Sequence, residues 1–426
     1  MGRKLSSLAL FGTILAGLFG YLYYVPNSEG VEQMDRIRLL SAAMKLIGFV
    51  GKVSETFGFP PAWYIQRNSG LILKKLKPAE IITDIEIRDT TIEGVPVRIY
   101  SPINFKNEKT KFLPAVIFYH GGAFYMGSVD THHPITRDLA RQTGFIIISV
   151  EYRLAPEHHF PAGLDDCMKV TKYFLNTNNA KKFHIDAQRI AISGDSAGLY
   201  SQTQSFVLHC LLFTGGNLAA VIAMRFASES ISEIRPRLQV LIYPVVQFFD
   251  LMVPSYLTPA LHIFHFGRGG QVLELYTGKS ISDDILANNH TSLEQRKTYR
   301  KYVDWSFIPK KYRQVYKEPI SDEMEGNAEL IKNAKLVLHR DISPLLVDDS
   351  DLAKLPPTYV LTVDHDRLRD EGFIYAGRLK ANGVKVVHHH FDNTFHGSLT
   401  FLDGLFELNI AHTMLNDIAK YLKENL

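Results

Sequence analysis

RIAISGDSAG, residues 189–198, joins a short apolar run to a Gly-x-Ser-x-Gly pentapeptide. This order is typical of a nucleophile elbow, in which a serine sits on a sharp strand-to-helix turn at the top of a sheet. Small neighbours let the backbone turn without a clash, so Gly194, Asp195 and Gly198 are expected to support Ser196. A Gly/Ser turn without chemistry is the alternative. The apolar run directly before the motif favours the elbow.

Further apolar runs on both sides of the elbow predict a mostly parallel sheet. The middle runs are almost continuous in apolar residues, which is the pattern of strands covered on both faces. Helical segments alternate with them, so we predict an α/β fold with helices on both faces of the sheet. The expected strands are an antiparallel hairpin at 81–102 that turns at Glu93-Gly94, then 114–120, 145–153, 189–196, 238–246, 358–364 and 384–391.

The run at 114–120 ends in His120-Gly121-Gly122-Ala123, which matches the HGGG-type loop that supplies oxyanion donors in α/β-hydrolases. Two glycines let the backbone approach a carbonyl oxygen closely. Ala123 replaces the third glycine, and its N–H stays available. A plain turn at the end of a strand is the alternative, and the presence of an elbow further along the chain counts against it.

A catalytic triad on this fold needs an acid and then a histidine after the serine. The segment after the strand at 358–364 offers four acids, namely Asp364, Asp366, Asp370 and Glu371. His396 follows the last expected strand in a loop beside Gly397, where it could orient between serine and acid. The neighbouring histidines 388–390 lie on the strand itself and are expected to alternate between surface and packed positions.

Composition excludes several other classes of protein. The net charge is +3, and no basic stripe suggests a nucleic-acid partner. Two cysteines rule out a disulfide framework. We find neither an HExxH motif nor another spacing of metal ligands, so no metal is expected.

The N-terminus predicts a membrane anchor. Residues 5–25 form a run of 21 residues without a charge, about the length that a transmembrane helix needs. Arg3 and Lys4 precede the run, so residues 1–4 should remain cytosolic and the body of the protein should be lumenal. A cleaved signal peptide is the alternative, but the run is long and ends in bulky residues rather than at a small-residue cleavage site.

The remaining chain divides into regions that differ in their pattern of apolar and polar residues. Residues 26–80 are expected to form helices of a cap or linker, with apolar residues spaced by three and four at positions such as Ile37, Leu40 and Met44. Residues 81–249 and 343–426 are the two parts of the expected core, and 250–342 form an insertion in a cap. Asn289 begins the one N-x-S/T sequon, which agrees with a lumenal body.

Together these motifs resemble the hormone-sensitive-lipase-like group of α/β-hydrolases, in its branch of arylacetamide deacetylases and neutral cholesterol ester hydrolases. The matching segments are GGAF after His120, EYRLAPEHHFPAGLDD at 151–166, GDSAG, DHDRLRDEG and FHGS. The resemblance implies that Ser196 is the nucleophile, Asp366 the acid and His396 the base. It places the oxyanion donors on the backbone N–H groups of Gly121, Gly122 and Ala197.

The resemblance also implies a single-pass type II protein of the endoplasmic reticulum membrane with a lumenal catalytic domain. Its substrates would be carboxylic esters or aryl amides of apolar or lipid molecules, hydrolysed without a cofactor. Asn289 aligns with a glycosylated sequon in one relative. The oligomeric state is not indicated.

One departure concerns the elbow itself, because the family runs GDSAGGNLAA without a break. Here seventeen residues, Leu199–Gly215, separate GDSAG from GNLAA, where the helix after the nucleophile should begin. The insert could supply a substitute helical turn that Gly215-Gly216 would break, or the elbow could relax and leave an impaired hydrolase. We favour the second outcome. The residues FVLHCLLFTG can be encoded by a splice-acceptor-like run, so the insert could be translated intron or an alternative exon edge.

Overall fold

The computed structural model describes residues 20–25, 29–75, 82–103, 112–195, 214–229, 231–258, 269–316 and 325–426, together with Thr13 and Gly17. Most of the expected membrane segment lies outside these ranges. So do Ser196, Ala197 and Gly198, together with nearly all of the insert that follows them.

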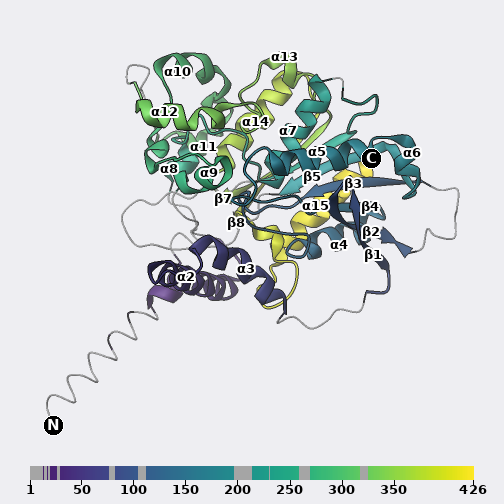
Figure 1. The fold of residues 1–426 in the computed structure, drawn as a ribbon, viewed down its shortest axis with the longest axis horizontal. Coiled ribbons are helices and arrows are strands. Elements are labelled where there is room, and N and C mark those ends of the chain that lie inside the picture. Colours follow the sequence, from purple (N-terminus) through teal and green to yellow (C-terminus); the bar gives the residue numbers. More distant parts are fainter. Residues whose placement is uncertain are drawn as a thin grey trace, which may run out of the picture.

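An eight-stranded sheet crosses the middle of the molecule (Figure 1). The strand order is β1-β2-β4-β3-β5-β6-β7-β8, and β2 alone runs against its neighbours. The strands are β1 (Ile85–Ile92), β2 (Val95–Pro102), β3 (Leu113–Tyr119), β4 (Ile146–Val150), β5 (Ile185–Asp195), β6 (Leu238–Ile242), β7 (Thr358–His365) and β8 (Val386–Phe395). Each predicted strand is present, and the expected hairpin turns at Glu93 and Gly94, both with positive φ.

The apolar runs form strands that are buried on both faces. Along β3, Ile117 and Tyr119 pack into one hydrophobic core, whereas Val116 and Phe118 pack into the other. Successive side chains of a strand point to opposite faces, so a run without polar residues needs a cover on each side. The predicted α/β class is confirmed.

Helices supply these covers. On one face lie α5 (Ala162–Phe174), α7 (Gly215–Ser228) and α14 (Arg369–Ala381). On the other lie α4 (His133–Thr143) and α15 (Asn409–Asn425). Helix α7 packs against β3, β5 and β6, so its N-terminus lies at the carboxyl end of β5, where the elbow is expected.

Two N-terminal helices, α2 (Met34–Thr56) and α3 (Ala62–Lys75), lie side by side at one corner of the molecule (Figure 1). As expected from their spacing, Ile37, Leu40 and Met44 of α2 are buried, and they join the second core. No described helix combines the length and the hydropathy needed to cross a bilayer.

The described parts of residues 250–342, namely 250–258, 269–316 and 325–342, contain short helices that gather to one side of the sheet (Figure 1). They are α8 (Pro254–Leu257), α9 (Gly269–Thr277), η2 (Asp283–Ala287), α10 (Leu293–Tyr299), η3 (Arg300–Tyr302), η4 (Trp305–Phe307), α11 (Lys310–Arg313), α12 (Ala328–Ala334) and η5 (Lys335–Leu338). The remaining short elements of the core are α6 (Thr177–Lys181), α13 (Asp349–Leu352) and η6 (Ser398–Thr400).

Candidate active site

The two ends of the interrupted elbow meet at the carboxyl end of β5. A Cβ at Gly194 would lie 2.1 Å from the carbonyl oxygen of Gly215. A Cβ at Gly215 would lie 2.0 Å from the carbonyl oxygen of Tyr119. Both distances are far inside van der Waals contact, so both positions require glycine. The start of α7 therefore packs directly on β5, although the two segments are far apart in sequence.

This packing corrects the expected boundary of the insert. In the less favoured alternative, a helical insert would be broken by Gly215-Gly216 before Asn217, but all three residues belong to the first turn of α7. Deleting 199–215 or deleting 198–214 leaves the same sequence, so the sequence alone could not choose between Gly198 and Gly215. In the structure it is Gly215 that makes the close contact with β5.

Thr214 precedes this glycine at the N-cap position of α7 and is fully buried. Its Oγ1 accepts a hydrogen bond of 2.7 Å from the backbone N–H of Phe124. The point at which the chain returns from the insert is thus bonded to the loop that follows His120. No sequence pattern predicts this contact, because Thr214 lies within the insert as its bounds are read from the sequence.

The loop after β3 is held by Asp195, the second residue of the elbow motif. The N–H of Gly121 donates a hydrogen bond of 3.0 Å to Oδ1 of this buried carboxylate. The oxyanion role expected of Gly121 does not fit this geometry, since its N–H already has a partner. Within the described part of the chain, the N–H groups of Gly122 and Ala123 have no such partner.

The same loop requires glycine at position 122, because it leaves no room for a side chain there. The φ of Gly122 is +134°, and a Cβ there would lie 2.1 Å from the carbonyl oxygen of Met126. Ala123 has a φ of 55°, in the left-handed region that a residue with a Cβ seldom adopts. Backbone strain of this kind persists where the surroundings enforce it, and it is common at active sites.

His120 lies beneath this loop and is fully buried. Its ring stacks on Tyr152 at 4.3 Å, and the Tyr152 hydroxyl donates to the His120 carbonyl oxygen at 2.6 Å. Burial lowers the pKa of His120 to about 3, so the imidazole is neutral near pH 7. A neutral, stacked histidine supports the loop and is not placed to exchange protons.

The expected acid and base lie together. Nδ1 of His396 is 2.9 Å from Oδ2 of Asp366, and both side chains are almost fully buried. Oδ1 of Asp366 accepts a hydrogen bond of 2.8 Å from the N–H of Leu368, which holds the carboxylate at the start of α14.

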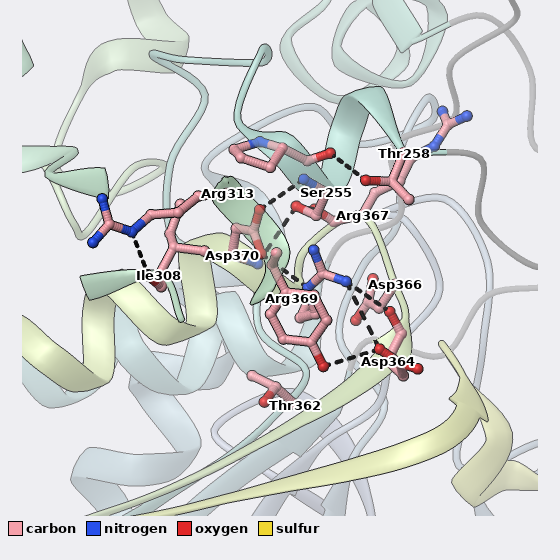
Figure 2. A network of polar contacts seen from close by, with 12 residues as sticks. Ser255, Thr258, Ile308, Arg313, Thr362, Asp364, Asp366, Arg367, Arg369 and Asp370 are labelled. Carbon is pink, nitrogen blue, oxygen red and sulfur yellow. Dashed lines mark hydrogen bonds and ion pairs between the residues drawn. The ribbon is translucent and has the colours of Figure 1, made fainter. Parts of the chain in front are cut away.

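The other three candidate acids are engaged elsewhere, two of them in the network of Figure 2. Arg369 lies between Asp364 and Asp370, with Nε 2.9 Å from Oδ1 of Asp370 and Nη1 3.8 Å from Oδ1 of Asp364. Asp370 also accepts a hydrogen bond of 2.7 Å from the N–H of Ser255. The structure thus distinguishes Asp366 from the other candidate acids, which the positions of the four acids in the sequence could not do.

Glu371, the fourth candidate, is fully buried and binds the loop after β6. Its Oε2 accepts from the N–H groups of Val246 at 2.6 Å and Gln247 at 3.0 Å. Its Oε1 accepts from the Tyr256 hydroxyl at 2.9 Å. Burial raises the pKa of Glu371 well above its ordinary value.

The same loop begins with Tyr243, whose ring lies 4.7 Å from the ring of His396. Tyr243 is fully buried and has a φ of 36°, so its backbone is held in a strained conformation. Tyr243 is not predictable from the sequence, because an apolar strand followed by proline gives no sign of a contact with His396.

One group of possible metal ligands occurs among the described residues, formed by Asp364, His390 and Asp392. Lys311 lies 3.1 Å from Asp392, and Tyr312 donates to Asp364 at 3.0 Å. Cationic and hydroxyl donors thus already serve these oxygens, and we assign no metal to the group. The neighbouring His388 and His390 are half-buried and His389 is exposed, which fits the predicted alternation.

Asn289 lies half-buried in the segment between η2 and α10. Its carbonyl oxygen accepts a hydrogen bond of 2.8 Å from the N–H of Asn327. The sequon is therefore part of the short-helix region at 250–342 and lies apart from the residues around His396 in sequence.

Comparison with known proteins agrees with this architecture. A model of the α/β-hydrolase fold family matches residues 116–199 and 305–400, so its first match ends where the insert begins. Arylacetamide deacetylase of Bos taurus is 34% identical over 437 residues and covers 100% of both chains. Neutral cholesterol ester hydrolase 1 of Mus musculus is 31% identical over 431 residues, covering 99% of this chain and 100% of its own.

A solved structure is similar as well. A hyperthermophilic esterase from the archaeon Pyrobaculum calidifontis is 26% identical with a TM-score of 0.58, and the match covers 92% of this chain and 98% of the esterase. The chain belongs to the α/β-hydrolase fold family, in the group of arylacetamide deacetylase and neutral cholesterol ester hydrolase. It is accordingly an ester-bond hydrolase of the carboxylesterase type.

Proposed function

We propose that this chain is a membrane-anchored serine hydrolase that cleaves carboxylic esters, or aryl amides, of apolar substrates through an acyl-enzyme. The single observation that carries the proposal is the contact of 2.9 Å between Nδ1 of His396 and Oδ2 of Asp366. Of the four acids offered by one short segment, this one faces the histidine. A carboxylate on Nδ1 leaves Nε2 as the atom that can act as a base.

In this mechanism Ser196 attacks the acyl carbonyl while His396 takes its proton. The histidine returns the proton to the leaving group, and water then releases the acyl group by the same route. Asp366 holds the imidazole in its orientation and stabilises its cationic form. These roles follow the order of serine, acid and base along the chain.

The oxyanion would be stabilised by N–H groups of the loop after His120. The contact between Gly121 and Asp195 supports Gly122 and Ala123 as the donors of this loop. Preorganised donors of this type act where negative charge develops on the carbonyl oxygen. Ala197 is the donor expected from the elbow itself.

The anchor, the lumenal orientation and the residence in the endoplasmic reticulum belong to the same proposal. They are supported by the uncharged run at residues 5–25, by the basic residues before it and by the sequon at Asn289. An anchor would keep the active site near the bilayer, which favours apolar and lipid esters as substrates. No cofactor is needed for this chemistry.

A second candidate is an impaired hydrolase, and the position of Gly215 favours it. Gly215 makes the close contact with β5, and Thr214 precedes it at the N-cap of α7. Ala197, the oxyanion donor expected from the elbow, is therefore not the residue that precedes α7. We therefore expect the chain without the insert to be the more efficient esterase.

The decisive test compares this chain with the same chain lacking residues 199–215. Hydrolysis of a p-nitrophenyl ester should be at least as fast in the shortened chain, and each activity should vanish in Ser196→Ala. An active-site-directed fluorophosphonate provides the second measurement, because it labels a serine only where the base and the oxyanion donors are aligned. A folded shortened chain that neither hydrolyses the ester nor reacts with the probe would refute the proposed function.

A further inference from the structure

Exposed apolar side chains gather on one part of the surface. Fourteen large apolar or aromatic side chains are exposed in the described residues, and ten of them lie between Tyr23 and Tyr64. Phe57 and Phe59 are the most exposed of these ten, at 73% and 69%. Apolar residues scattered singly over a surface need no explanation, but a contiguous group marks an interaction site.

The group follows one face of α2 and continues into the turn before α3. Leu39, Leu46, Phe49 and Val53 are spaced by three, four and seven residues and are exposed. Since a helix has 3.6 residues per turn, these positions lie opposite the buried stripe that begins at Ile37. Helix α2 therefore has two apolar faces, and only the inner one is covered by the catalytic domain.

We call the outer face, with the turn that follows it, the apolar surface. It consists of Leu39, Leu46, Phe49, Val53, Phe57 and Phe59. Asp35, one turn before Leu39, marks its polar edge.

Lys45 joins α2 to the end of the N-terminal apolar run. Its Nζ donates to the carbonyl oxygens of Tyr21 at 2.6 Å and Tyr24 at 2.8 Å, and it lies 4.9 Å from the centre of the Tyr21 ring. Residues 20–23 are helical, so the ammonium group caps the C-terminal end of that helical segment. The apolar surface is thus fixed beside the point where the uncharged run of residues 5–25 ends.

We propose that the apolar surface of α2 and the following turn docks on a lipid bilayer and lies in its interfacial layer. The proposal goes beyond the proposed function, although it uses the same anchor. Because the run of residues 5–25 ends on α2, an anchored chain brings this surface to the membrane without any further movement. An amphipathic helix in this position buries its apolar face about 5–10 Å into the boundary between headgroups and acyl chains.

Helix α3, which packs against α2, connects this pair of helices to the proposed active site. Arg67 donates to the carbonyl oxygen of Tyr125 at 2.6 Å and to Glu157 at 2.6 Å. Gln66 accepts a hydrogen bond of 3.1 Å from the Tyr125 hydroxyl. Tyr125 follows the proposed oxyanion donor Ala123 by two residues. If the apolar surface lies in the bilayer, α3 would therefore hold the loop after His120 close to the membrane surface. A hydrolase of apolar esters would then meet its substrate where the substrate is dissolved.

The experiment measures which surface positions contact lipid in the full chain. Single cysteines are introduced at Phe49→Cys and Phe57→Cys, and at the control positions Val315→Cys and Leu405→Cys, in a Cys210→Ser background. Cys167 is fully buried and should not react. The controls are matched, because Val315 and Leu405 are apolar and 77% and 70% exposed, but lie on other parts of the chain.

Each variant is labelled with an environment-sensitive fluorophore and reconstituted at low density into phosphatidylcholine vesicles. The vesicles carry nitroxide-labelled phosphatidylcholine, with the nitroxide either near the headgroup or deep in the acyl chain. We expect the labels at 49 and 57 to shift to shorter emission wavelengths and to be quenched roughly two-fold more than the controls, since an interfacial helix reaches the acyl boundary. The shallow nitroxide should quench them more strongly than the deep one.

Three other outcomes overturn the proposal. Equal quenching at all four positions in a vesicle-bound chain would remove the docking surface and leave the proposed anchor intact. A blue shift at 49 and 57 without quenching by lipid nitroxides would show that a second copy of the chain covers the surface. A chain that does not float with the vesicles would remove both the anchor and the docking surface, while its esterase activity would still be measured separately.

Discussion

Gly194 and Gly215 approach each other so closely that there is no room for a side chain between them. A methyl group added at Gly215 or at Gly198 therefore tests which of these two glycines packs on β5 at the start of the helix. If Gly215 starts the helix in this chain, Gly215→Ala must push apart backbone atoms of β3, β5 and α7. We expect a loss of about 2–3 kcal/mol in the free energy of unfolding, the range of overpacked core sites. Gly198→Ala should be nearly neutral in the same chain. Urea denaturation followed by circular dichroism measures both.

The shortened chain provides the control for this pair. Its GDSAGG sequence has one glycine at the position in question, so the same Gly→Ala change there should be as costly as Gly215→Ala is in the full chain. Gly20→Ala, where nothing lies within 4 Å of the new Cβ, controls for the substitution itself. If Gly198→Ala proves costly and Gly215→Ala neutral in the full chain, the assignment of Gly215 is wrong.

The Asp195 side chain couples the end of β5 to the loop after His120. Its Oδ1 accepts the N–H of Gly121, and the next two residues of the loop are the proposed donors. In the shortened chain, Asp195→Ala should lower kcat by roughly 10²-fold with a smaller effect on KM, comparable to the loss of one oxyanion donor. Asp195→Asn keeps an oxygen acceptor and should lose less. An Ala variant that folds and retains full kcat would show that the loop needs no support from Asp195.

At the scale of elements, the loop after β6 joins three parts of the site. Tyr243 at its start lies against His396, and the Asn217 side chain of α7 donates to the Val245 carbonyl oxygen at 3.1 Å. Glu371 of α14 accepts two of the loop's backbone N–H groups. The proposed base His396 and the helices α7 and α14 are therefore positioned by one short segment.

Glu371 gives this loop a dependence on pH. Burial raises the pKa of Glu371 in the folded protein, so the folded state retains a proton that the unfolded chain loses as the pH rises above about 4.5. Stability contributed by this group is thus present at low pH and lost as the pH rises towards the folded pKa. The slope is about 1.4 kcal/mol per pH unit within that window.

Glu371→Gln should therefore gain stability relative to the parent between pH 4 and pH 7. The amide oxygen can still accept from Val246 and Gln247, and the amide nitrogen can donate to Tyr256. Glu371→Ala should be destabilising at every pH, because it leaves two buried N–H groups without an acceptor at about 1–3 kcal/mol each. Glu424→Gln, on the exposed end of α15, is the control. A difference between Gln and parent that does not change with pH would show that Glu371 stays charged.

The elements themselves were largely predictable from sequence. The runs that form β3, the part of β5 after Arg189 and the first part of β7 are mostly apolar, and such runs indicate strands covered on both sides. β6 is shorter than its run because Tyr243 adopts a positive φ and Pro244 follows, which end the ladder. β8 continues through Asp392 to Phe395, past the predicted end, because polar residues at the edge of a sheet leave no hydrophobic signal.

Less of the site was predictable. The order of acid and base along the chain led to Asp366 and His396, but the choice among four acids needed the contacts of Arg369 and Ser255. The engagement of Gly121 by Asp195 depends on where two strand ends meet, which no local pattern encodes. On α2, the spacing of apolar residues predicts the buried inner face but not the exposed outer one, because an exposed apolar face has no counterpart within the chain.

At the scale of the whole molecule, helices α2 and α3 link the end of the N-terminal apolar run to the catalytic domain. α2 is bonded to the end of the apolar run through Lys45 and packs on the second core, while α3 binds the segment after the oxyanion loop. If residues 5–25 anchor the chain as proposed, these contacts fix how the proposed active site faces the bilayer. In that proposal the side of the membrane is set by the basic residues before the run.

Glycosylation at Asn289 reports that side. If the catalytic domain is lumenal, the full chain expressed in mammalian cells should carry one N-glycan, and endoglycosidase H should reduce its mass. Asn289→Gln and Thr291→Ala should each abolish the shift, because both remove the sequon. Asn289 is half-buried, so its own modification also depends on access before folding. A second sequon made by Leu405→Asn with Glu407→Thr, at a position that is 70% exposed, removes that dependence. If neither site is modified in a membrane-bound chain, the catalytic domain faces the cytosol and the proposed orientation is wrong.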